Sequence, residues 1–161
     1  MKLKNLLFFP VFFSVVLLTQ AVNAEKVTDV MTYAKNNDLN DTYSQANLMQ
    51  RCAGVLMGYA KTLPVDMKKA KTNFAEFGKK LILKAGMVLY ERGILYNKEL
   101  SSEKQIKSND DTMKQNMIAL EFYTNHYFSK IENNQLATAS IFSGEVMEEL
   151  KLCKSVVNSI K

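Results

Sequence analysis

Residues 42–64 read TYSQANLMQRCAGVLMGYAKTLP, and this stretch decides the fold class. Its apolar residues recur every three or four positions, the spacing that places side chains on one face of an α-helix. Asp41 or Thr42 can cap this helix, and Thr42 with Gln45 makes a capping-box pattern. Pro64 ends it, because the residue before a proline disfavours the helical region. The apolar row comprises Leu48, Cys52, Val55, Tyr59 and Leu63.

Comparable apolar rows on both sides of this stretch predict further helices. We expect a short helix over Val27–Asn36 and a long one over Asp66–Arg92, which Gly93 would end. Residues 94–100 could instead extend the long helix or form a short separate turn. Another helix begins between residues 108 and 111 and ends at residues 132–134, and a last one covers about residues 136–160. The polar residues 101–111 predict a loop.

The composition of the chain also favours helices. Beyond residue 24 there are six glycines and one proline, whereas a β-sandwich or barrel needs a turn every 8–12 residues. Amphipathic helices bury their apolar faces by packing together, and short connections make neighbours antiparallel. The sequence therefore predicts a single all-α domain that resembles a four-helix bundle, with a possible short extra helix at the N-terminus.

The first 24 residues differ from the rest. Lys2 and Lys4 precede a mostly apolar run from Leu6 to Leu18, and Val22-Asn23-Ala24 has the small residues of a cleavage site. This pattern is typical of a secretory signal peptide, and the run is short for a spanning helix, which needs about 20 residues. We expect residues 1–24 to be removed and residues 25–161 to be exported to the periplasm or secreted; an uncleaved membrane anchor is the alternative.

Export would allow the two cysteines to form a disulfide, because disulfides persist in oxidising compartments. Cys52 and Cys153 lie on the apolar faces of the first and last long helices, which run antiparallel in an up-down-up-down bundle. Counting residues along each helix places both at about the same level. We therefore predict a structural disulfide between Cys52 and Cys153. Free buried thiols are the main alternative.

Charge is unevenly distributed along the chain. Residues 61–84 hold seven lysines and two acids, whereas residues 110–149 hold seven acids and two lysines. The basic segment could meet an anionic surface or an acidic partner; alternatively it is a solvated surface whose lysines pair with the acidic helices. The seven lysines are Lys61, Lys68, Lys69, Lys71, Lys79, Lys80 and Lys84. Removal of Lys2 and Lys4 lowers the net charge from +5 to +3, which is too small for a nucleic-acid-binding surface, so we expect no nucleic acid partner.

No catalytic or metal-binding constellation stands out. His126 is the only histidine, which excludes the di-iron bundles with two Glu-x-x-His motifs. We interpret it as a partly exposed side chain beside core aromatics, with haem held by one His and one Met as a remote alternative. The methionines, including Met113 and Met117, have core spacing and need not bind copper. We expect no cofactor.

Glycines inside the expected helices need a reason, because each costs about 1 kcal/mol relative to alanine in a helix interior. Gly54 and Gly58 lie four residues apart on one helix. This spacing lets another backbone approach closely, either within the bundle, which we favour, or at a groove or dimer seam.

These observations favour an exported, non-enzymatic helical protein of the cell envelope that binds another molecule, such as an envelope protein or an anionic surface. A second hypothesis is a bundle that binds a small ligand or cofactor through its interior near His126, either as a carrier or as an enzyme. A third is a protein that binds the surface of anionic membranes through the basic helix of residues 61–84.

Overall fold

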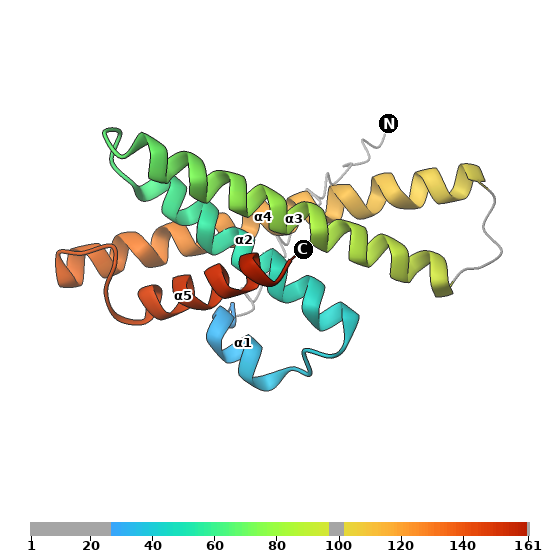
Figure 1. The fold of residues 1–161 in the computed structure, drawn as a ribbon, viewed down its shortest axis with the longest axis horizontal. Coiled ribbons are helices and arrows are strands. Elements are labelled where there is room, and N and C mark those ends of the chain that lie inside the picture. Colours follow the sequence, from blue (N-terminus) through green and yellow to red (C-terminus); the bar gives the residue numbers. More distant parts are fainter. Residues whose placement is uncertain (1–26, 97–101, 161) are drawn as a thin grey trace, which may run out of the picture.

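The computed structural model describes residues 27–96 and 102–160, and within these ranges the chain forms five α-helices and no β-strand. The helices are α1 (Val30–Asn36), α2 (Thr42–Thr62), α3 (Lys68–Tyr96), α4 (Ser102–Thr138) and α5 (Gly144–Ser159) (Figure 1). The predicted all-α bundle with an extra N-terminal helix is therefore confirmed. The predicted signal peptide, residues 1–24, lies outside the described residues.

Helix α2 is the centre of the fold, since all four other helices pack against it. Asp41 caps its beginning and accepts a hydrogen bond from the backbone N–H of Ser44 at 2.8 Å. The Gln45 side chain donates to the Leu39 carbonyl instead of completing the predicted capping box. The predicted apolar row of α2 is buried along its whole length. This row is the core on which the other helices converge.

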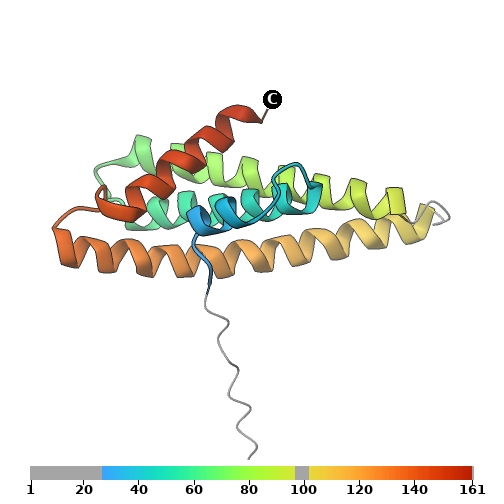
Figure 2. The same ribbon diagram turned by 90° about the horizontal axis from the view of Figure 1, so that it is seen from below.

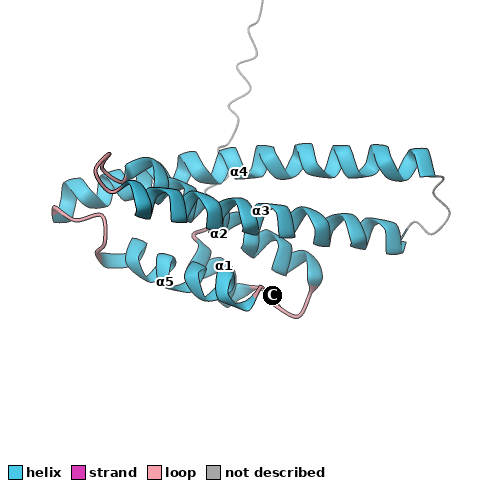
Figure 3. Cartoon of the chain, turned by 45° about the horizontal axis from the view of Figure 1, so that its top comes forward, coloured by secondary structure: helices cyan, strands magenta, loops and turns pink. Residues whose placement is uncertain are grey.

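The long helices α2, α3 and α4 run side by side along the molecule (Figure 1). In Figure 2, α4 lies along one side of α2 and α3, and α5 crosses their other side next to α1. Beyond the beginning of α2, α3 and α4 continue together as a pair (Figure 3). Among the helices described, none has an apolar stretch long enough to cross a membrane.

The predicted link between Cys52 on α2 and Cys153 on α5 is confirmed. Their sulfur atoms are 2.18 Å apart and their Cα atoms 5.0 Å apart, and both side chains are fully buried. The disulfide joins residues 101 positions apart. It therefore attaches the last helix to the central one across the core.

Gly54 and Gly58 allow α4 to approach α2 closely. A Cβ atom at Gly54 would overlap the Cβ atom of Tyr123, and one at Gly58 would lie 3.0 Å from the backbone nitrogen of Phe128. The residue numbers of the contacting positions increase together along the two helices, so α2 and α4 run in the same direction. The favoured interpretation of these glycines, close packing within the bundle, agrees with these contacts.

Several predicted helix boundaries are wrong. Residues 102–111 are helical, because α4 begins at Ser102 rather than near residue 108. The chain has no glycine or proline between Gly93 and Gly144, so polar composition alone does not interrupt the helix. For the same reason α4 passes residues 132–134 and reaches Thr138. Helix α3 passes Gly93 and reaches Tyr96, because a single glycine weakens a helix without necessarily ending it.

The end of α4 is set by a turn rather than by its asparagines. Ala139 adopts a positive φ of 58°, and its N–H donates to the Gln135 carbonyl at 2.8 Å. The Asn134 side chain donates to the Ser140 carbonyl and so holds the turn. Residues 139–143 therefore form a connection that was predicted to be helical. Phe142 from this connection stacks on Tyr59, with ring centroids 5.5 Å apart.

Candidate functional site

Five of the seven predicted lysines gather on one side of α3, which we call the lysine face. At 100° per residue, their positions fall within one half of the helix circumference. Residues buried against the bundle, such as Phe74, Leu81 and Ala85, occupy the opposite half. The amphipathic pattern of α3 thus turns four of these lysines outward, whereas Lys84, at the edge of the face, is partly buried. The lysine face consists of Lys68, Lys69, Lys79, Lys80 and Lys84.

The other two predicted lysines do not join this face. Lys61 lies at the end of α2, where its Nζ donates to the Asn125 side chain at 3.1 Å and lies 5.9 Å from the centre of the Phe128 ring. Lys71 is partly buried on another side of α3. The predicted cluster of seven is therefore a face of five.

The lysine face has no acidic partner in the part of the chain that the structure describes. The ion pairs there involve Arg92, Lys130 and Lys151 instead. Lys80 makes only a backbone contact, in which Nζ donates to the Ile160 carbonyl at 3.3 Å. The five lysines of this face therefore do not form ion pairs with the acidic helices. The positive charge remains available to an external partner.

Apolar side chains are exposed among these lysines. Leu83 and Met87 are each 54% exposed on the outward half of α3, and Phe77, which is 40% exposed, lies at the edge of this half. The exposed Glu76 lies among the lysines but forms no ion pair with them. The outward side of α3 therefore combines an excess of positive charge with exposed hydrocarbon.

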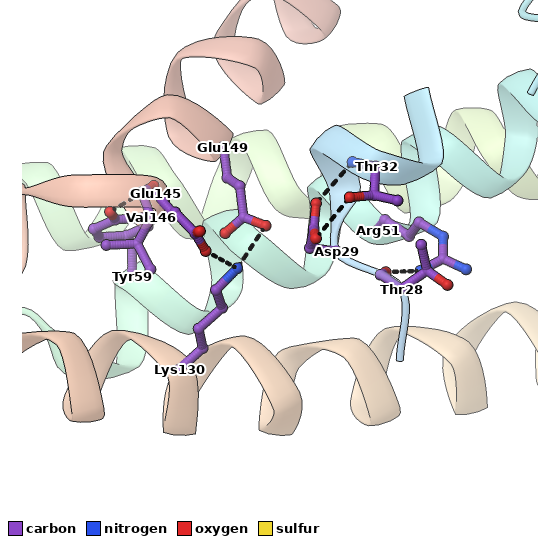
Figure 4. A network of polar contacts seen from close by, with 9 residues as sticks. All are labelled: Thr28, Asp29, Thr32, Arg51, Tyr59, Lys130, Glu145, Val146 and Glu149. Atoms are coloured by element: carbon purple, nitrogen blue, oxygen red, sulfur yellow. Dashed lines mark hydrogen bonds and ion pairs between the residues drawn. The ribbon is translucent and has the colours of Figure 1, made fainter. Parts of the chain in front are cut away.

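A buried ion pair lies elsewhere, between α4 and α5 (Figure 4). Glu149 is 1% exposed, and its Oε1 accepts a hydrogen bond from Lys130 Nζ at 3.0 Å. Glu145, which is exposed, lies 3.6 Å from the same Nζ. Burial raises the pKa of Glu149, although the hydrogen bond and charge of Lys130 oppose that rise. The sequence analysis counted Glu149 among the seven acidic residues of positions 110–149 but did not predict that it is buried.

This pair adjoins the anchorage of the N-terminal segment (Figure 4). Asp29 caps α1 by accepting a hydrogen bond from the Thr32 N–H at 2.7 Å. Arg51 of α2 donates to the Thr28 carbonyl, and its guanidinium lies 4.4 Å from the centre of the Tyr33 ring. These contacts hold α1 on the bundle. The Thr32 hydroxyl also donates to Asp29 Oδ2 at 2.9 Å, so the side chains of this cluster are largely engaged with one another.

His126 is partly buried on α4, with its ring edge-on to Tyr127 at a centroid distance of 4.9 Å. Burial lowers the pKa of His126, and the charges of Lys130 and Arg51 lower it further, while the charge of Asp29 opposes this. Within the described ranges, no three His, Cys, Asp or Glu side chains are grouped to hold a metal ion.

Sequence reasoning missed a buried pair of amides. Gln50 of α2 and Asn116 of α4 are 8% and 1% exposed, and Gln50 Nε2 donates to Asn116 Oδ1 at 2.8 Å. They form the inner end of a cleft between α2, α3 and α4. Asn116 lies three residues after Met113 and four before Leu120, so helical spacing alone could have marked it.

No known protein family, curated protein sequence or solved structure matches this chain.

Proposed function

We propose that this chain is an exported, non-enzymatic envelope protein that attaches to the surface of an anionic membrane through the lysine face of α3. The observation that carries the proposal is that all five lysines of this face lack an acidic partner among the described residues, while leucine, methionine and phenylalanine side chains are exposed between or beside them. A partner that satisfies both features must be negatively charged and must accept apolar groups.

An anionic bilayer surface has both properties. A lysine near such a surface contributes about 1 kcal/mol, so five lysines supply several kcal/mol at low ionic strength. Leu83 and Met87 can enter the boundary between headgroups and acyl chains, where apolar area adds to the attraction. An acidic protein would satisfy the charge but would need its own apolar groups at matching positions.

Export is supported by the N-terminal sequence pattern and by the Cys52–Cys153 disulfide, which an oxidising compartment would maintain. Outside the cytoplasm, the lysine face would meet the outward surface of a membrane or the periplasmic surface of an envelope. The bundle would serve as a rigid body that presents α3.

Flotation of residues 25–161 with vesicles tests the proposal. We expect binding to vesicles of mixed phosphatidylglycerol and phosphatidylcholine and no binding to phosphatidylcholine alone. Replacement of Lys68, Lys69 and Lys79 by glutamine should reduce binding strongly, since each charge contributes about 1 kcal/mol. Added salt should weaken binding by the wild-type chain, because it screens exposed charges.

A matched control keeps the same net charge but changes other surfaces. Lys35, Lys114 and Lys151 are exposed and lie on α1, α4 and α5. Their replacement by glutamine should leave most of the binding intact. Equal loss in both triple variants would show that net charge alone governs binding, and absence of binding by the wild-type chain would refute the proposal outright.

A further inference from the structure

A cleft of about 650 Å³ opens between α2, α3 and the N-terminal half of α4. This volume lies within the range of sites that hold small molecules. The cleft is separate from the lysine face, since it is lined mainly by α4 and includes none of the five lysines of that face. Its walls carry six neutral residues with hydrogen-bonding groups and three charged residues, Lys104, Lys107 and Asp111.

The inner end of the cleft has a defined polarity. Asn116 Nδ2 donates to the Ile82 carbonyl on α3, so Asn116 Oδ1 faces Gln50 and accepts from Gln50 Nε2. This arrangement fixes the orientation of the Gln50 amide. Its Oε1 accepts no hydrogen bond from any residue that the structure describes. One acceptor therefore remains open to a molecule in the cleft.

The backbone is adapted to this arrangement. Gly86 on α3 faces both Met113 and Asn116, and a Cβ atom there would lie 2.7 Å from Met113 Sδ and 2.9 Å from Asn116 Nδ2. A glycine in a helix interior is unfavourable relative to alanine, and a buried amide pair is unfavourable relative to apolar side chains. Two such features at one place indicate that a polar inner end has a use beyond packing.

The outer part of the cleft follows one side of α4. Ser108, Thr112 and Gln115 lie at spacings of four and three residues and offer hydroxyl and amide groups. Lys107 also lines the cleft, nine residues before Asn116, which is about 13 Å along the helix axis. Tyr43 of α2, which is 55% exposed, contributes a flat apolar ring.

We propose that this cleft binds an acidic saccharide. A hydroxyl or acetamide group of the sugar would donate to Gln50 Oε1, other groups would pair with the side chains of α4, and its carboxylate would lie near Lys107. The tyrosine ring would cover the apolar C–H face of the sugar. A fatty acid fits less well, because its hydrocarbon would cover buried amides. A multiply charged phosphate would meet Asp111 in the same wall.

Titration of ¹⁵N-labelled residues 25–161 with N-acetylmuramic acid tests this proposal. We expect saturable shifts of the side-chain amide resonances of Gln50 and Asn116. N-acetylglucosamine lacks the lactyl carboxylate, so its binding should be weaker by about tenfold, the effect of one charge-assisted hydrogen bond. Lys107→Gln should remove this difference between the two sugars. Gln115→Ala should weaken the binding of both.

The control is Lys114→Gln, since Lys114 is exposed on α4 and does not line the cleft; it should leave both affinities unchanged. Gln115→Ala and Lys107→Gln change residues at the surface, so backbone amide spectra that match those of the wild-type chain would show that the variants are folded. Absence of saturable shifts at Gln50 and Asn116, equal affinity for the two sugars, or tighter binding of adenosine monophosphate would each overturn the proposal. Vesicle binding should not change in the cleft variants, so the two proposals can fail separately.

Discussion

Lys130 of α4 donates a hydrogen bond to Glu149 of α5 at 3.0 Å, and the Glu149 side chain keeps only 2% of its surface exposed. The pair joins two helices that share few other contacts, next to the place where α1 docks. A buried carboxylate of this kind is tolerated only while it is paired. Its partner is therefore more sensitive to substitution than the many exposed charges of the chain.

We expect Lys130→Met to lower the free energy of unfolding by about 3–5 kcal/mol at neutral pH, because Glu149 then remains buried and unpaired. Chemical denaturation measures this loss. Lys151→Met is the matched control, since Lys151 pairs with Glu148 at 2.6 Å while both side chains are 58% exposed; it should cost at most about 1 kcal/mol. Similar losses in the two variants would contradict a special role for the buried pair.

The same pair predicts a pH dependence. Because burial raises the pKa of Glu149, the folded chain holds this proton more tightly than the unfolded chain does. The contribution of Glu149 to stability is thus greatest below its unfolded pKa of about 4.5 and declines as pH rises through the folded value. Lys130→Met raises the folded pKa further, so its destabilisation should shrink in acid. A pH-independent loss would exclude this explanation.

The disulfide predicts a large effect of reduction. It closes a loop of about 100 residues, for which the chain-entropy model gives about 4–5 kcal/mol. Urea denaturation with and without reductant should show this difference for the wild-type chain. In the double variant Cys52→Ala/Cys153→Ala, reductant should have no effect. Equal stability of oxidised and reduced wild-type protein would show that the link contributes nothing.

Two glycines provide opposite predictions. Gly54→Ala places a methyl group against the backbone of Tyr123, so α2 and α4 must separate. We expect the free energy of unfolding to fall by about 1–3 kcal/mol, the range typical of overpacking. At Gly93 no described heavy atom lies within 4 Å of an added Cβ, so Gly93→Ala should stabilise α3 by about 0.5–1 kcal/mol. Thermal denaturation compares them directly. Stabilisation by Gly54→Ala would contradict the close approach of the two helices.

Export predicts the covalent form of the chain. If residues 1–24 are a signal peptide, material recovered from the envelope or medium begins at Glu25 and carries the Cys52–Cys153 link. Mass spectrometry before and after alkylation identifies both features. A chain that begins at Met1, or that reacts at both cysteines without reduction, would contradict export.

Much of the fold followed from helical spacing. The row that begins at Leu48 is buried as predicted, and it placed Cys52 opposite Cys153 because helix geometry relates residue number to axial position. The predictions failed where they used polarity to end a helix. Residues 102–111 are helical although polar, since a helix that packs against a neighbour needs apolar residues only on the side that faces this neighbour.

The candidate sites were less predictable. On α4 the apolar residue Met117 was assigned to the core, yet it is 53% exposed, while Asn116 beside it is 1% exposed. A hydrophobicity pattern selects Met117, because it cannot see that Gln50 and the Ile82 carbonyl will satisfy the Asn116 amide. The same limit applies to Glu149, whose partner Lys130 is 19 residues away in sequence.

The sequence by itself determined an all-helical chain, the disulfide partners and the concentration of lysines in residues 61–84, because these depend on local composition and on periodicity along single helices. Only the tertiary structure decided which polar side chains are buried, where α4 ends and that the lysine face lacks acidic partners. Each of these depends on atoms from helices far apart in sequence, and burial becomes favourable only when such atoms supply the missing hydrogen bonds and charges.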